Sequence, residues 1–163
     1  MVTQSDFTSE EWLQIMTAPQ MASMYVTLAS PSGPVGIVAE TMAASKLVVQ
    51  AIKETSGNAL IDAVAAEYRE RAENRQKLDM PQLSRNADEL KAQCLQACRD
   101  LAALLSEKAP TEADGFVQWV YRAAQSTAEA AKEGGFLGIG GKKVGEAEVA
   151  APEEISAALG ISA

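Results

Sequence analysis

Apolar residues recur every three to four positions along most of the chain, and this spacing predicts an all-α fold. No stretch alternates apolar and polar residues for long enough to predict a strand. The predicted helices run from Thr8 to the residue before Pro31, from Pro34 to about Thr55, from Asn58 to about Glu73, from Asn86 to Lys108, and from Thr111 to Gly134-Gly135, with a short last one from about Glu146 to Leu159-Gly160, interrupted or restarted at Pro152. We expect a single-domain bundle of five to six helices over residues 1–163, with a possible sub-boundary in the 74–86 connection.

Three predicted helix starts carry capping signals. Thr8 and Glu11 have the spacing of a capping box, in which each side chain accepts a hydrogen bond from the other residue's backbone. Asn58 is a suitable cap for the third helix, and Asn86 with Glu89 resembles a second capping box.

The first two predicted helices form an apolar hairpin. No charged residue occurs from Trp12 to Ala39, although prolines and polar residues interrupt the run too often for a membrane-spanning helix. A wide apolar arc on the second helix indicates burial on more than one side. Four of the six methionines lie in this hairpin, and methionine adapts to irregular partners.

This hairpin allows three interpretations. The leading one is a self-association surface, and its candidate residues are Trp12, Ile15, Met16, Met21, Met24, Tyr25 and Met42. Alternatively, these side chains form the core of the domain, or the methionines and Trp12 line a cavity for a small molecule or lipid.

A glycine-rich segment follows the fifth predicted helix. Its candidate anion-binding residues are Gly138, Gly140, Gly141, Lys142 and Lys143, since consecutive backbone N–H groups can form an anion nest. The spacing does not match a phosphate-binding P-loop, and no strand precedes the segment. The structural alternative is a loop whose apolar side chains plug into the core.

Composition excludes several classes of function. The chain has 22 acidic and 14 basic residues, a net charge of −8 and no histidine, which removes His-dependent triads and His-containing zinc sites. The negative charge predicts no nucleic-acid partner. Cys94 and Cys98 lie one helical turn apart and are best interpreted as small buried hydrophobes rather than a redox pair. No basic residue precedes Lys46, so a secretory signal is not expected. We therefore expect a cytoplasmic location.

The two ends of the chain carry a recognisable pattern of residues, which is weak in the middle. It consists of Trp12-Leu13, Ala18-Pro19, Pro31-Ser32-Gly33, Glu40, Gly134-Gly135-Phe136-Leu137-Gly138-x-Gly140-Gly141, Val144, Glu148 and Glu154-Ile155-x-x-Ala158-Leu159-Gly160. This pattern resembles a family of small uncharacterised bacterial helical proteins. The resemblance implies a bacterial, cytosolic all-α domain and brings no activity, cofactor or catalytic residue.

The final segment is also similar to the helical tellurite-resistance (TerB-like) fold, in which acidic residues near helix starts bind metal. The segment lacks the acidic Ala-Asp-Gly turn of that fold, and Gly145 and Pro152 replace the expected serine cap and helix former. No metal ligand is therefore transferred to this chain.

Taken together, the sequence predicts a non-enzymatic helical protein without a cofactor, which self-associates through its N-terminal hairpin. The alternative is a small-molecule or lipid-binding bundle whose glycine-rich loop, with Lys142 and Lys143, holds an anionic head group. A third hypothesis, an enzyme that uses Cys94 or Cys98, requires a reactive thiol.

Overall fold

The protein is described by a computed structural model, which covers residues 2–29, 48–50, 56–137 and 146–161. A short 3-10 turn precedes the helices α1 (Ser9–Ala29), α3 (Ala59–Glu73), α4 (Ala87–Lys108), α5 (Pro110–Leu137) and α6 (Glu146–Ala158), and residues 48–50 are also helical. No strand occurs among the described residues, so the all-α bundle is confirmed. Most of the predicted second helix, and with it the second arm of the hairpin, lies outside the described residues.

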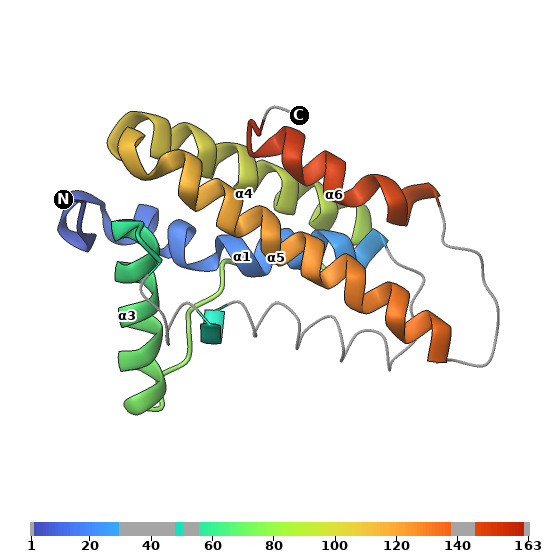
Figure 1. The fold of residues 1–163 in the computed structure, drawn as a ribbon, viewed down its shortest axis with the longest axis horizontal. Helices are drawn as coiled ribbons and strands as arrows, with labels where there is room; N and C mark the ends of the chain where they lie inside the picture. Colours follow the sequence, from blue (N-terminus) through green and yellow to red (C-terminus); the bar gives the residue numbers. More distant parts are fainter. Residues whose placement is uncertain (1, 30–47, 51–55, 138–145, 162–163) are drawn as a thin grey trace.

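Helix α1 lies at the centre of the bundle, where α4, α5 and α6 all pack against it (Figure 1). Ile15, Met16 and Val26 have no exposed surface, and they belong to one core cluster with residues from all three neighbours. Tyr25 donates a hydrogen bond to the carboxylate of Glu154 on α6. Burial, reinforced by this hydrogen bond, raises the pKa of Tyr25 to about 12.

Helix α1 continues through Pro19, which lacks the N–H that would bond the carbonyl of Ile15. At the next carbonyl, that of Met16, the hydroxyl of Tyr68 on α3 donates a hydrogen bond of 2.6 Å, and the side-chain amide of Gln20 contacts the same hydroxyl. A side chain from another helix therefore hydrogen-bonds α1 in the turn that the proline weakens.

Helix α3 crosses the N-terminal end of α1 and extends away from the other helices (Figure 1). The indole Nε1 of Trp12 donates to Glu67 Oε2 at 2.8 Å, and Arg71 pairs with the other oxygen of the same carboxylate at 2.7 Å. At the same end of α1, Lys108 Nζ lies 2.7 Å from Glu11 Oε2 and joins the end of α4 to the start of α1.

The predicted capping signals are present with one difference. Thr8 and Glu11 form the reciprocal capping box, and Asn58 Oδ1 accepts from the first N–H groups of α3. Asn86 Oδ1 caps α4 in the same way, but Glu89 accepts from the hydroxyl of Ser84 at 2.6 Å instead of from the backbone of Asn86.

Asn58 has a second function, because its Nδ2 donates to the carbonyl of Glu112 at the start of α5. A Cβ placed at Gly115 would lie 2.6 Å from that same Nδ2. The glycine in the first turns of α5 therefore allows the close approach of α3.

Two predicted helix boundaries are wrong. Helix α5 begins at Pro110 and continues through Gly134-Gly135 to Leu137, because glycine weakens a helix by about 1 kcal/mol without sterically preventing it. Helix α6 passes through Pro152 without a restart. A proline removes a single helical hydrogen bond, and the flanking Ala151 and Ile155 are fully buried, which holds the helix in place.

Helices α3 and α6 both end in a Schellman motif with a left-handed residue after the cap. In α6 this residue is Gly160, with a φ of 70°, and in α3 it is Arg75, with a φ of 54°. The left-handed conformation costs a residue with a side chain roughly 1–2 kcal/mol, whereas glycine adopts it freely.

Replacing Arg75 with glycine is therefore expected to raise the free energy of unfolding by about 0.5–1 kcal/mol, after subtraction of the larger unfolded-state entropy of glycine. The Arg75 side chain is exposed, so little packing is lost. Urea unfolding measures the change. The matched variant Gly160→Ala should shift the midpoint in the opposite direction, and a lower midpoint for Arg75→Gly would contradict the analysis.

Candidate functional site

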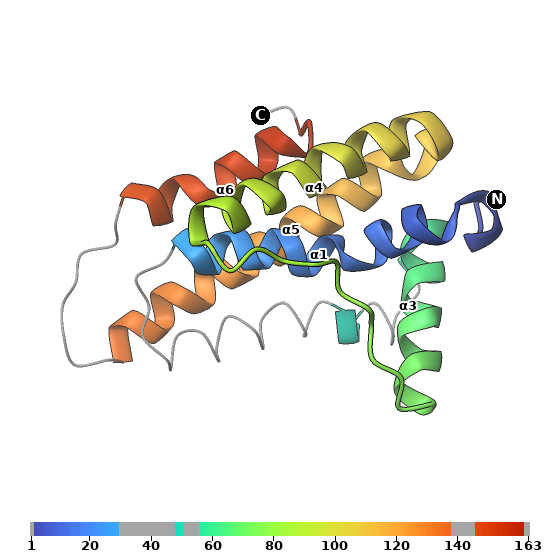
Figure 2. The ribbon, with the colours of Figure 1, turned by 180° about the vertical axis from the view of Figure 1, so that it is seen from behind.

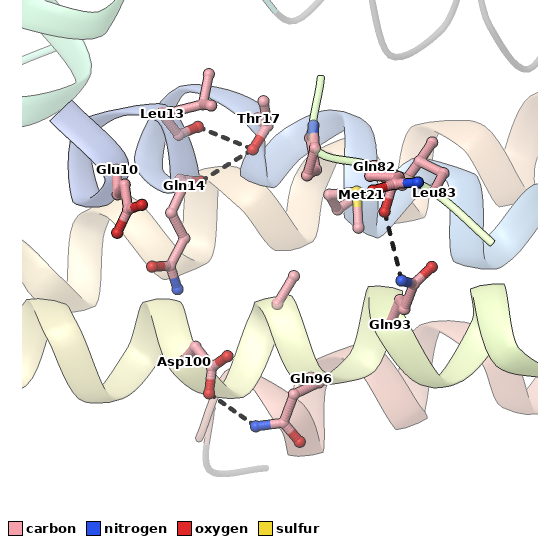
Figure 3. Close-up of a pocket in the computed structure, with 12 residues that line it drawn as sticks. Glu10, Leu13, Gln14, Thr17, Met21, Gln82, Leu83, Gln93, Gln96 and Asp100 are labelled. Atoms are coloured by element: carbon pink, nitrogen blue, oxygen red, sulfur yellow. Dashed lines mark hydrogen bonds between the residues drawn. The ribbon is translucent and has the colours of Figure 1, made fainter. Parts of the chain in front are cut away.

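A groove of about 400 Å³ lies between α1, α4 and the connection from α3 to α4. Figure 2 shows that this connection runs alongside α1 before it reaches α4. The lining residues are Glu10, Leu13, Gln14, Thr17, Met21, Pro81, Gln82, Leu83, Gln93, Gln96, Ala97 and Asp100 (Figure 3). The groove is therefore built from two parts of the chain that are distant in sequence, α1 and the segment from Pro81 to Asp100.

The walls are mainly apolar, and Leu13, Met21 and Leu83 contribute the largest apolar side chains. Thr17 adds little polarity, because its hydroxyl donates to the carbonyl of Leu13 at 2.9 Å and is satisfied within α1. The groove thus offers apolar contact along α1.

The connection is held against α4 by side-chain hydrogen bonds. Gln93 Oε1 accepts from the backbone N–H of Ser84 at 2.9 Å, and the Gln93 amide nitrogen lies 3.5 Å from the carbonyl of Gln82 (Figure 3). The Ser84 hydroxyl in turn donates to Glu89. These contacts fix the position of the wall that carries Pro81 and Leu83.

Apart from Thr17, the polar lining among the described residues consists of amides and carboxylates and includes no lysine or arginine. Gln96 Nε2 donates to Asp100 Oδ1 at 2.7 Å. Arg99 contacts this lining through the amide oxygen of Gln96, at 3.5 Å. The groove therefore combines apolar walls with hydrogen-bonding groups and negative charge.

A second hollow, of about 470 Å³, lies between the end of α4, the start of α5 and the end of α6. Its walls combine small residues such as Ala102 and Ala113 with the aliphatic side chains of Val117, Leu159 and Ile161 and with polar groups. It offers less apolar side-chain surface than the groove beside α1, which is therefore the better candidate site.

The structure places most of the predicted interaction surface inside the bundle. Trp12, Ile15, Met16 and Tyr25 are at least nine-tenths buried by the chain's own helices, and Met24 is half-buried. Their burial within the chain's own bundle accounts for the apolar pattern that suggested a subunit contact. These side chains form the core of the domain, which was the alternative interpretation of the hairpin.

The remaining predicted site residues do not belong to this core group alone. Met21 is also buried, but it lines the groove. Met42 and the anion-binding candidates Gly138, Gly140, Gly141, Lys142 and Lys143 lie outside the described residues.

The thiols of Cys94 and Cys98 are buried on the core side of α4. Burial raises the pKa of Cys94 to about 11, and burial together with the neighbouring Cys94 raises that of Cys98 to about 12. Since the thiolate is the nucleophile, both groups are poorly suited to covalent chemistry at neutral pH.

The groove residues themselves gave little sequence signal. Leu13, Gln14, Gln96 and Asp100 are half-buried or exposed positions beside a buried helical stripe, where almost any residue is compatible with a helix. Leu83 lies in the connection and has no periodic pattern around it. Only the tertiary arrangement brings these residues together.

Comparisons of this chain with known protein families, curated proteins and solved structures find no match. The resemblance based on the terminal motifs therefore stays a prediction. In the described part of the chain, no helix is both long and apolar enough to cross a bilayer. Over the same residues, no group of three acidic, cysteine or histidine side chains is arranged to hold a metal ion.

The buried thiols yield a direct prediction. Iodoacetamide at pH 7 is expected to label Cys94 and Cys98 far more slowly in the folded protein than in denaturant, because both sulfurs are inaccessible and protonated. Mass spectrometry of the time course gives both rates. Rapid labelling of the folded chain would contradict this burial and revive the hypothesis of a cysteine enzyme.

Proposed function

We propose that this protein is a non-enzymatic binding module that holds a small molecule with an apolar body in the groove between α1, α4 and the 74–86 connection. The observation that carries the proposal is the groove itself, whose volume of about 400 Å³ lies within the ordinary range for small-molecule sites. Its composition is also typical of such sites, which are mostly apolar with a few polar groups that orient the ligand.

The side chains of the groove favour binding over catalysis. The hydroxyl of Thr17 donates to the carbonyl of Leu13 and is engaged within α1. Cys94 and Cys98 do not line the groove. A free hydroxyl or thiol nucleophile is thus absent from the described lining, and its amides and carboxylates are suited to orienting a ligand.

Self-association remains a prediction with weaker support. The apolar side chains of α1, the first arm of the hairpin, are mostly buried in the core. Among the described residues, the large hydrophobic side chains that are exposed are Val49 and Met80. Scattered single residues of this kind are normal on a monomer surface. The cytoplasmic location and bacterial origin likewise stay expectations.

Filling the groove should weaken binding. Ala97 is half-buried in the lining, so Ala97→Phe is expected to weaken the binding of the neutral apolar dye N-phenyl-1-naphthylamine by about tenfold or more, roughly 1.4 kcal/mol. Dye fluorescence, which increases in an apolar site, measures the affinity.

The matched control is Ala92→Phe, at an exposed position of the same helix that does not line the groove. It should leave a wild-type affinity, and thermal melts establish that both variants fold. Equal dye affinity in wild type and a folded Ala97→Phe variant would refute the proposed function.

A further inference from the structure

We infer that the groove is selective for a positively charged amphiphile, whose cationic group lies at the end of the groove that carries Glu10 and Asp100 and whose apolar body extends toward Met21 and Leu83. This inference rests on the proposed function and adds the chemical class of the ligand. It departs from the expectation of an anionic head group, which depended on the glycine-rich segment and its lysines.

The antiparallel arrangement of α1 and α4 gives the groove two different ends. Glu10 and Asp100 lie toward one end in Figure 3, while Met21, Leu83 and Gln93 lie toward the other. The rise of an α-helix makes the distance along α1 from Glu10 to Met21 about 16 Å. A ligand that lies along the groove therefore meets charge at one end and apolar surface at the other.

The acidic end is not neutralised by the described residues. Neither Glu10 nor Asp100 forms an ion pair among them, and Asp100 accepts only the neutral amide of Gln96. The nearby Lys108 is paired with Glu11. The side chain of Lys108 and the backbone N–H of Thr8 both lower the pKa of Glu11. Within the described lining, two carboxylates without an ion pair and the absence of lysine and arginine favour a cation over an anion.

The net charge of −8 also attracts cations, but it does so over the whole protein and not specifically at the groove. A test must therefore separate the local carboxylates from the overall charge. Asp100 is the diagnostic residue, because Glu10 also stabilises the N-terminal turn of α1.

The experiment compares three ligands of equal chain length, decylamine, decanol and decanoate, as competitors of N-phenyl-1-naphthylamine at pH 7, low salt and sub-micellar concentration. Decylamine is expected to bind several-fold more tightly than decanol, and decanoate more weakly than either. Asp100→Asn should weaken decylamine about two- to fivefold, the range of an exposed ion pair, and leave decanol unchanged. Added salt should reduce the preference for the amine.

Glu107→Gln is the matched control, since it removes one negative charge from an exposed position of α4 outside the groove. It should leave the decylamine affinity at the wild-type value. Equal affinities of decylamine and decanol, or equal losses in Asp100→Asn and Glu107→Gln, would overturn the inference.

Both of these outcomes leave dye binding, and with it the proposed function, intact. Failure of the wild-type protein to bind the dye or any decyl compound would instead remove the proposed function. Circular dichroism of Asp100→Asn checks that the variant folds, and Glu10→Gln provides a second removal of charge at the same end if it does not.

Discussion

The structure depends on the burial of one helix, α1, on nearly all sides. No charged residue occurs in α1 after Glu11, and such a helix is stable in water only when other helices cover it. Helices α4, α5 and α6 supply that cover, each through an apolar stripe. Within α1, the hydroxyls of Thr17 and Thr27 are satisfied locally, because each donates to a carbonyl one turn earlier.

The groove is a consequence of this cover being incomplete. One strip of α1, which includes Leu13 and Gln14, faces α4 across a gap that is bridged by an irregular segment rather than by another helix. An irregular segment cannot interdigitate with α1 as a helix does, so space remains between them. Gln93 and Ser84 fix the segment in position, and the space is therefore bounded by hydrogen-bonded structure.

Local signals in the sequence predicted much of the fold. The caps at Thr8, Asn58 and Asn86 and the buried stripe of α4 depend on residues a few positions apart, which a sequence displays directly. The glycine pair at 134–135 was misleading because propensity is a small free energy that the rest of a long helix overrides. Pro152 was misleading for a different reason, since its larger cost of about 3 kcal/mol in a helix interior is offset by the burial of Ala151 and Ile155.

The candidate site was not predictable, for a different physical reason. An apolar pattern reports that a side chain avoids water, but it does not report what covers that side chain; Ile15 and Met16 could be buried by another subunit or by their own chain. The groove adds residues such as Gln96 and Asp100, which are ordinary on any helix surface and gain significance only from the antiparallel alignment that places Asp100 toward the same end of the groove as Glu10. Because the ends of the groove differ in charge only through this alignment, its ligand preference is a property of the packing, and neither helix alone encodes it.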